Sequence, residues 1–339
     1  MTEINQPPSP ELFFETINAY QRTAALKTAI ELDLFSALAE RQTAPADIAA
    51  RCGAAERGVR ILCDYLTIYG FLTKTETGYG LTPDSATFLD RRSPAYMGGT
   101  LEFLHSPTLR EGYERLTEAV RRGGTAITDG GTTAPENPVW VRFARGMAPM
   151  MQMPAELLVQ LVGGGERDRK LRVLDIAAGH GMFGIAFARH FTQAEVVALD
   201  WPHVLEVAQE NAVRFGVSER YQTLPGSALE IEFGASYDLV LLTNFLHHFD
   251  HATCVRLLGK VHAALATGGR AVTLEFVPNE DRVTPPAAAA FSLTMLASTP
   301  AGDAYTFPEL ERMFAEAGFA RSEIHPLPPT MEQVVVSFK

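Results

Sequence analysis

The chain has 339 residues, 46% of them hydrophobic and 20% charged, which is the composition of a globular protein long enough for two domains. A net charge of −11 argues against general affinity for nucleic acid or an anionic membrane, and three widely spaced cysteines indicate neither a disulfide framework nor a metal site. No signal pattern and no apolar run of eighteen residues is found, so we expect a cytoplasmic protein.

The N-terminal part of the chain is predicted to be helical. Apolar residues recur at helical spacing over 10–40, with a break near Asp33. A short helix should follow, with Thr43 as its N-cap and Gly53 as its stop. A further helix is expected over 55–69, where apolar residues again recur every three or four positions.

Two short segments, 71–74 and 79–82, flank a polar turn and are predicted to form a β-hairpin. Helices followed by a hairpin make a winged-helix pattern, so one alternative function is a metabolite-sensing regulator that binds DNA. The helix that would read DNA has no net charge, whereas such a helix needs a basic face. Its charged residues are Glu56, Arg57, Arg60 and Asp64. We therefore expect residues 1–105 to be a helical winged-helix dimerisation domain that forms a homodimer.

Residues 106–165 are predicted to be a helical connector. By composition, 121–138 is a flexible surface loop. A helix is predicted over 140–161, where several methionines cluster. Methionine clusters more often fill cores, but this one precedes the next domain and could line an apolar substrate cleft. On that interpretation Phe143 and Met147 are candidate acceptor contacts.

The stretch that ends at Asp200 predicts one βαβ half of a nucleotide-binding sheet, with a strand, a glycine turn, a helix and a second strand. Gly179 and Gly181 let the backbone approach a ligand, and Asp200 lies where an acid accepts hydrogen bonds from ribose hydroxyls. With Gly184 these glycines form a literal G-x-G-x-x-G, so a nicotinamide dehydrogenase is an alternative. Asp175 favours S-adenosylmethionine, because a carboxylate suits an ammonium better than a pyrophosphate.

Strands and helices continue to alternate after Asp200, which predicts a parallel sheet with helices on both faces. The first of the later strands leads into His247, and the second carries Glu275 near its end. The last two lie close together and could form an antiparallel edge. These strands are expected at 237–244, 268–276, 322–326 and 334–338.

Five motifs then occur in the order and spacing of one enzyme family: LDIAAGHG, LDWPHV, LTNFLHHFD, LEFVPNED and TFPELERMFAEAGF. In these motifs the chain resembles the S-adenosylmethionine-dependent small-molecule O-methyltransferases, which include plant caffeic-acid-type and bacterial polyketide enzymes. The resemblance covers nearly the whole chain. It implies an α/β fold, in which a Rossmann-like class I methyltransferase domain at 166–339 follows the winged-helix domain in the chain. It also implies S-adenosylmethionine as cofactor and a hydroxyl of an aromatic or polyketide-like small molecule as acceptor.

The resemblance further implies roles for single residues. His247 matches the family's general base, and Glu275 matches one of the two acids that orient it. The cofactor would be held by Asp175, Ala177, Gly179, Gly181, Asp200, Trp201, Ser227, Ala228, Thr243 and Asn244. By their positions, the candidates for an apolar acceptor pocket are Phe143, Met147, Phe291 and Met295.

The sequence departs from the family pattern at several positions. Ala177 stands where a glycine is usual, a replacement that is tolerable if φ there is negative. Ser227 replaces an aspartate on the adenine side, and the second orienting acid falls on Ala304. His248 replaces the aspartate that commonly follows the catalytic histidine. These departures leave open a C- or N-methyltransferase, or a relative that binds the cofactor without transferring methyl.

Overall fold

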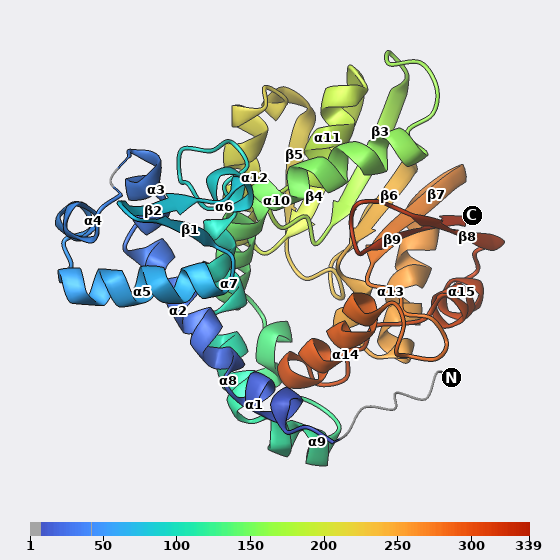
Figure 1. The fold of residues 1–339 in the computed structure, drawn as a ribbon. Coiled ribbons are helices and arrows are strands. Elements are labelled where there is room, and N and C mark those ends of the chain that lie inside the picture. The colour runs from blue at the N-terminus through green and yellow to red at the C-terminus, as the bar shows by residue number, and fades with distance from the viewer. Residues whose placement is uncertain (1–7, 42) are drawn as a thin grey trace. The chain divides into compact units, whose positions relative to one another are not determined.

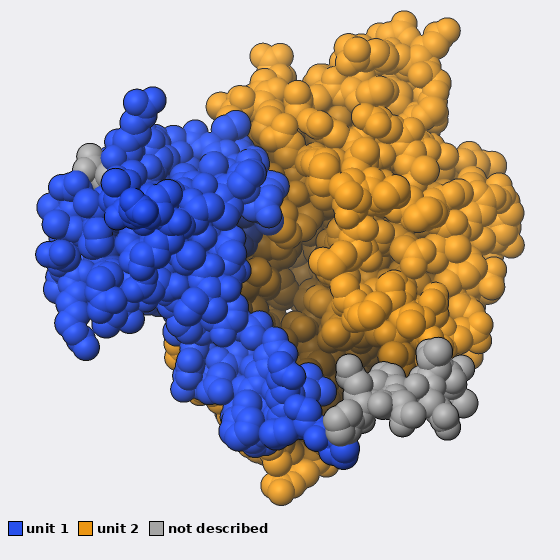
Figure 2. Space-filling view, viewed as in Figure 1, with its two compact units in different colours: residues 1–101 blue, residues 102–339 orange. Residues whose placement is uncertain are grey.

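The computed structural model describes residues 8–41 and 43–339 and is shown in Figure 1. By their internal contacts the residues form two compact units, Met1–Leu101 and Glu102–Lys339, which are coloured separately in Figure 2. No helix in these described ranges is both long enough and apolar enough to cross a membrane.

The first unit consists of helices and the predicted hairpin. Asp33 has a left-handed φ of 55° between two helices, which confirms the predicted break, and Gly53 ends a helix as expected. The predicted Thr43 cap is wrong, because Ala44 occupies the N-cap and the carbonyl of Thr43 instead accepts the N–H of Tyr79 at 3.0 Å. The elements are α1 (Glu11–Ile17), α2 (Ala19–Glu31), α3 (Leu34–Ala39), α4 (Pro45–Cys52), α5 (Glu56–Ile68), β1 (Leu72–Thr75), β2 (Gly78–Leu81) and α6 (Pro83–Phe88).

Helix α1 leaves an apolar surface exposed. Leu12, Phe13, Phe14 and Ile17 are 57–75% exposed, although the unit has a separate buried core made by α2 to α5 and the hairpin. Several adjacent apolar side chains left in water mark a surface that gains free energy when another protein surface covers it.

A seven-stranded mixed sheet forms the centre of the second unit. The strand order is β5-β4-β3-β6-β7-β9-β8; neighbours from β5 to β7 are parallel, and β9 is antiparallel to both β7 and β8. The predicted parallel sheet with an antiparallel edge is therefore confirmed. The strands are β3 (Lys170–Ile176), β4 (Gln193–Asp200), β5 (Tyr221–Pro225), β6 (Tyr237–Thr243), β7 (Leu265–Glu275), β8 (Arg321–Pro326) and β9 (Gln333–Phe338).

Helices cover both faces of this sheet (Figure 1). On one face lie α10 (Val139–Val162), α11 (Met182–His190) and α12 (Pro202–Arg214), and on the other lie α13 (His251–Ala264) and α15 (Phe307–Glu316). The chain order reverses between β3 and β6, and ligands of such sheets bind beyond the carboxyl ends of the strands at this point. The second unit also contains α8 (Pro107–Glu114), α9 (Leu116–Arg122) and α14 (Pro286–Ser298), and α7 (Leu101–Leu104) lies at its start.

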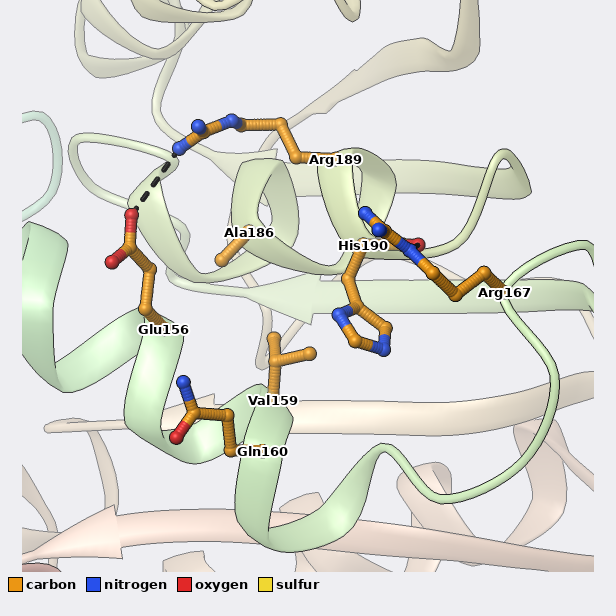
Figure 3. A pocket seen from close by; sticks show the side chains of 7 residues that line it. All are labelled: Glu156, Val159, Gln160, Arg167, Ala186, Arg189 and His190. Carbon is orange, nitrogen blue, oxygen red and sulfur yellow. Dashed lines mark hydrogen bonds and ion pairs between the residues drawn. The ribbon is translucent and has the colours of Figure 1, made fainter.

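Helices α10 and α11 leave a shallow pocket of about 210 Å³ between them (Figure 3). An ion pair between Glu156 and Arg189, 3.3 Å long, closes one side of it. Its lining mixes both charges and includes none of the predicted site residues, so we regard it as a surface hollow. The lining residues are Glu156, Val159, Gln160, Arg167, Ala186, Arg189 and His190.

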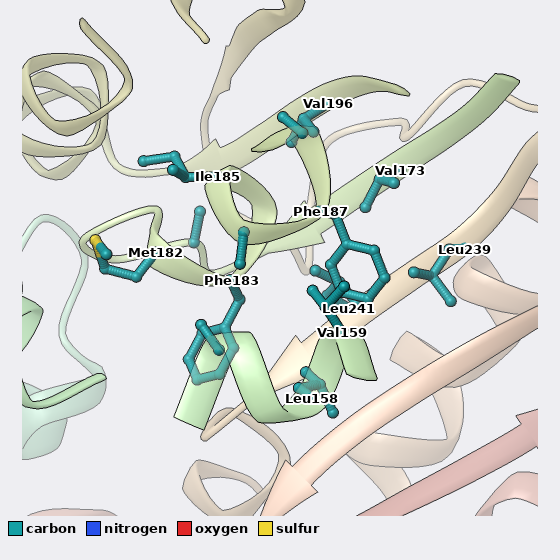
Figure 4. Packing of buried hydrophobic residues seen from close by; sticks show 14 of the residues in the cluster. Leu158, Val159, Val173, Met182, Phe183, Ile185, Phe187, Val196, Leu239 and Leu241 are labelled. Atoms are coloured by element: carbon teal, nitrogen blue, oxygen red, sulfur yellow. The ribbon is translucent and has the colours of Figure 1, made fainter. Parts of the chain in front are cut away.

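Beneath this pocket the same two helices bury a continuous core against the sheet (Figure 4). The core contains side chains from α10, α11, α12 and six strands of the sheet, so the turn between β3 and α11 rests on a rigid base. The residues that carry this packing include Leu158, Val159, Phe183, Phe187, Val173, Val196 and Leu239.

The segment 121–138 is well packed, which corrects the prediction of a flexible surface loop. The N–H of Thr125 donates to the carbonyl of Thr299 at 2.8 Å, and the buried Thr132 hydroxyl donates to the carbonyl of Ser298 at 3.0 Å. A Cβ added at Gly131 would lie 2.2 Å from that same Ser298 oxygen. The glycine therefore allows close packing against the end of α14.

Candidate active site

The turn after β3 has the conformation expected of a ligand-binding glycine turn. Gly179 and Gly181 have φ values of 57° and 75°. The N–H of Gly179 donates to Oδ2 of Asp200 at 2.8 Å, which ties the turn to the end of β4. A Cβ at Gly181 would lie 2.5 Å from the hydroxyl of Tyr221, so a larger residue would displace the turn.

Ala177 begins this turn with a φ of 53°, so the negative φ at which an alanine would be tolerated without strain is not found. The next residue explains the conformation, because the N–H of Ala178 donates to the carbonyl of Leu199 at 3.1 Å and holds the turn over β4. A left-handed conformation costs an alanine on the order of 1 kcal/mol relative to its preferred regions. The turn thus holds strain that a glycine would not have.

Two aspartates lie next to the turn. Asp175 is 0% exposed; its Oδ2 accepts the N–H of Gly184 at 3.0 Å, and its Oδ1 has no hydrogen-bond partner among the described residues. Oδ1 of Asp200 accepts the N–H of Trp201 at 2.7 Å. Burial raises the pKa of Asp175 to about 7 and that of Asp200 to about 6. Both carboxyl groups keep acceptor capacity for a ligand that donates hydrogen bonds.

His180 lies between the two turn glycines as a neutral ring. Its Nδ1 accepts the N–H of Met182 at 3.1 Å, and burial lowers the pKa of His180 to about 4. The ring stacks on Phe143 with centroids 5.8 Å apart. Phe143, a predicted acceptor contact, therefore lies against the glycine turn, and a Cβ at Gly179 would be 3.3 Å from its ring.

A buried histidine–glutamate pair lies at the carboxyl ends of β6 and β7. His247 belongs to a 3-10 turn, η4 (Leu246–His248), and Glu275 is the last residue of β7. Nδ1 of His247 is in hydrogen-bond contact with Oε2 of Glu275, while Oε1 accepts the N–H groups of Phe245 at 3.0 Å and Leu246 at 2.9 Å. The two side chains are only 5% and 3% exposed. One carboxylate thus holds both the ring and the turn, and it leaves Nε2 available for chemistry.

Aromatic rings and a close backbone contact surround this histidine. The ring of Phe291, from α14, meets His247 edge-on at 4.8 Å and stacks on Phe276 at 4.2 Å. A Cβ at Gly302 would lie 2.2 Å from the carbonyl oxygen of His247. Burial and the neighbouring His247 lower the pKa of His248 well below its usual value, so the second ring is neutral. The predicted contact Phe291 is thus beside the predicted base.

The other predicted cofactor residues follow β5 and β6. The Ser227 hydroxyl accepts the N–H of Leu229 at 3.3 Å, and the carbonyl of Ala228 accepts Nζ of Lys260 at 2.9 Å, so both stabilise the loop after β5. Thr243 ends β6 and is buried. Asn244 follows with a φ of 55°, and its buried Oδ1 has no hydrogen-bond partner among the described residues.

The two predicted methionine contacts are buried. Met147 packs in the core between α10 and the sheet, and Met295 is buried on α14. Neither side chain forms a ring or hydrogen-bond contact with the histidine pair that the structure records. The structure therefore places Phe143 and Phe291 in the site more clearly than these two residues.

Glu332 is a buried acid near the histidine–glutamate pair that the sequence did not single out. It is 6% exposed and immediately precedes Gln333, which pairs with Glu275 between β9 and β7. Burial and the nearby Glu275 raise the pKa of Glu332 to about 7, while a hydrogen bond with Asn244 and the charge of His247 lower it. A single glutamate in a turn gives no sequence signal, because only the pairing of β9 with β7 brings it to the site.

Comparison with known proteins identifies the family. The sequence profile of an O-methyltransferase domain matches residues 113–320, and that of an O-methyltransferase dimerisation domain matches residues 14–91. The 3-hydroxy-5-methyl-1-naphthoate 3-O-methyltransferase of Streptomyces sahachiroi is 28% identical over 315 residues, which are 91% of this chain and 89% of that protein. The tetracenomycin polyketide synthesis 8-O-methyl transferase of Streptomyces glaucescens is 26% identical over 326 residues, 94% of each chain.

A solved structure is still more similar. A protein of Nostoc punctiforme PCC 73102, to which O-methyltransferase activity has been attributed, is 56% identical with a TM-score of 0.95 over 98% of this chain and 100% of that one. The dimerisation-domain match supports a homodimer, and the match of the catalytic domain supports a methyltransferase over the regulator and dehydrogenase alternatives. The chain belongs to the O-methyltransferase family and is an S-adenosylmethionine-dependent methyltransferase.

Proposed function

We propose that this enzyme methylates a hydroxyl group of an aromatic or polyketide-like small molecule, with His247 as the general base. The observation that carries the proposal is the buried contact between His247 and Glu275 at the carboxyl ends of two central strands. The names of the two relatives, one acting on a hydroxynaphthoate and one in polyketide synthesis, support this acceptor class.

The residues at the glycine turn fit S-adenosylmethionine. Gly179 and Gly181 have no side chains and left-handed φ values, so they can hold the methionine part of the cofactor closely. Asp175 has an unpartnered buried carboxylate oxygen suited to an ammonium group, and Asp200 has the acceptor capacity for ribose hydroxyls. Trp201, beside Asp200, would contact the adenine. When bound, the cofactor supplies a methyl group on a sulfonium, which makes that methyl group electrophilic.

His247 would remove the proton of the acceptor hydroxyl. A neutral hydroxyl is a poor nucleophile, and a histidine can take its proton near neutral pH. The carboxylate of Glu275 at Nδ1 fixes the tautomer in which Nδ1 carries the hydrogen and Nε2 has a free lone pair. The same carboxylate then stabilises the imidazolium ion. Such base assistance is typically worth about 10²–10⁴ in rate.

The aromatic residues around the base support an aromatic acceptor. Phe291 and Phe276 form a stacked pair, and the first of them meets the ring of His247 edge-on. Aromatic rings prefer stacked or edge-to-face contacts with other rings, and these apolar surfaces also exclude water from the base.

Two measurements test this proposal. Calorimetric titration should show micromolar binding of S-adenosylhomocysteine and none of NADH; binding of NADH alone would overturn the cofactor assignment. Transfer of a labelled methyl group should then be measured on hydroxylated aromatic compounds, starting with 3-hydroxy-5-methyl-1-naphthoate, beside amine and activated-carbon acceptors. Methylation only of the amines or carbons would contradict a hydroxyl acceptor.

The base is tested with His247→Ala. Turnover should fall by at least about 100-fold, because base assistance is lost, while the affinity for S-adenosylhomocysteine stays within about three-fold. A matched control is His251→Ala, at the start of α13, whose exposed ring contacts Glu316 at 2.9 Å. Unchanged turnover in the His247 variant would show that this histidine is structural.

A further inference from the structure

We propose that Glu332 is a second carboxyl group of the catalytic site, which holds Asn244 and supports the positive charge that His247 acquires as base. It would serve in place of the second orienting acid, whose expected position is occupied by the buried Ala304. This inference rests on the proposed base function of His247.

The backbone on both sides of Glu332 is fixed. On one side, Nε2 of Gln333 donates to the carbonyl of Val277 at 3.0 Å, and β9 begins its pairing with Glu275 at the same residue. On the other side, the Thr330 hydroxyl donates to the carbonyl of Leu327 at 2.6 Å. The carboxyl group is therefore held beside β7 by a rigid hairpin, and its position does not depend on a mobile loop.

The partners of this carboxyl group lie in the catalytic site. Asn244 by hydrogen bonding and His247 by its charge lower the pKa of Glu332, whereas Glu275 raises it, so all three residues are neighbours of this carboxyl group. Asn244 links β6 to η4, and its own N–H donates to the carbonyl of Leu274 at 2.8 Å. A group that holds Asn244 therefore also positions the turn that carries the base.

A purely structural role would not require a charge at this position. A glutamine could hydrogen-bond with Asn244 without the free-energy cost of burying a carboxylate. No lysine or arginine is among the groups that shift the pKa of Glu332, and the nearby Glu275 makes its ionisation harder. Among the described groups that shift the pKa of Glu332, His247 alone can become positive. A buried carboxyl group that gains an opposite charge only when the base is protonated is suited to catalysis.

The catalytic step explains how two carboxyl groups are used. The proton of the acceptor hydroxyl moves to Nε2 of His247, and the ring becomes an imidazolium ion. Glu275 contacts Nδ1 directly, whereas Glu332 acts through space and through Asn244. Glu332 is therefore a positioning residue in this proposal.

The test compares Glu332→Gln with Glu323→Gln, a control in the same hairpin whose exposed side chain pairs with Arg321. With an acceptor identified among the hydroxylated aromatic compounds tested above, Glu332→Gln should lower kcat by about 10- to 100-fold. A loss of this size corresponds to the energy of one partly screened interaction between two charges. KM for S-adenosylmethionine should stay unchanged. In a plot of kcat against pH, the fall in kcat on the acid side should move to lower pH, because the variant has lost a carboxyl group that titrates. An unchanged kcat and an unchanged pH profile would overturn the proposal.

A second readout needs no acceptor. Relative to wild type, Glu332→Gln should raise Tm at pH 8 and have little effect below about pH 4, where the carboxyl group is protonated in both folded and unfolded chains, because its pKa rises from 4.5 to about 7 on folding. In a His247→Ala background the gain at pH 6.5 should be larger, because the carboxylate has lost its cationic partner. An equal rise in Tm on Glu332→Gln in the wild-type and His247→Ala backgrounds would overturn the proposed interaction between Glu332 and His247. Absence of S-adenosylhomocysteine binding in the wild type would refute the proposed function alone and leave this readout valid.

Discussion

Replacing Glu275 by glutamine tests how the base is held. Oε1 of this residue accepts the N–H groups of Phe245, Leu246 and His247 at 3.0, 2.9 and 3.4 Å, and Oε2 contacts Nδ1 of His247. Glutamine has one carbonyl oxygen and one amino group. If the oxygen keeps the three backbone contacts, the amino group faces Nδ1 and donates to it. His247 then carries its hydrogen on Nε2, where no lone pair remains for the proton of the acceptor.

The magnitude follows from what is lost. General-base assistance is worth about 10²–10⁴ in rate, and the corresponding Asp→Asn change in the Ser-His-Asp triad costs about 10⁴ through the same tautomer effect. We therefore expect Glu275→Gln to lower kcat by about 10²–10⁴. Exchange of charge-assisted for neutral hydrogen bonds should lower the free energy of unfolding by about 1–2 kcal/mol, which leaves the fold intact.

The assay is single-turnover methyl transfer to the identified acceptor, with calorimetry of S-adenosylhomocysteine binding on the same preparations. Glu280→Gln, an exposed residue five positions further along, is the matched control and should behave as wild type. A Glu275→Gln enzyme that keeps more than about one third of the wild-type kcat would refute the tautomer argument.

Three further changes test other parts of the site. Asp200→Ala should weaken S-adenosylhomocysteine binding by at least about 10-fold in calorimetry, and normal affinity would contradict its role at the ribose. Gly302→Ala should lower kcat at least about 10-fold, because its Cβ would lie 2.2 Å from the His247 carbonyl; Gly259→Ala, in open space on α13, should instead raise the free energy of unfolding by about 0.5–1 kcal/mol in denaturant titrations. Equal kcat in both glycine variants would show that the backbone at His247 can move away from the added methyl group without loss of activity. Asp175→Asn should be more stable than wild type at pH 8 but not near pH 4. Burial raises the pKa of Asp175 from 3.8 to about 7, so between these pH values the folded chain holds a proton that the unfolded chain has lost. The free energy of unfolding of the wild type therefore falls by on the order of 4 kcal/mol as pH rises through this range. Parallel curves of Tm against pH for the wild type and Asp175→Asn would exclude this effect.

Features set by local sequence could be predicted. The β3–α11–β4 unit follows from apolar runs separated by glycines, and Asp200 lies at the end of its second strand, as predicted. Asp33 breaks a helical pattern, and the structure shows a left-handed residue there. His247 and Glu275 each end or follow a clear strand, so parallel pairing brings them together.

Features set by tertiary packing could not be predicted. Glycines and threonines over 121–138 suggest mobility, but the same small residues allow close packing against Ser298 and Thr299, which only the folded chain reveals. The φ of Ala177 depends on a backbone hydrogen bond to the next strand. Glu332 reaches the site through the pairing of strands that are far apart in sequence.

The position of β9 between β7 and β8 has a consequence for biosynthesis. Strand β8 is made before β9 and, in the described sheet, has no neighbour to pair with until β9 is made. While the ribosome is still adding residues 333–338, the nascent domain therefore exposes the hydrogen-bonding edge of β7. The three consecutive valines that later cover it, Val334, Val335 and Val336, are themselves prone to pair with other chains. The pairing of β9 therefore covers the edge of β7 in the same step that brings Glu332 near His247.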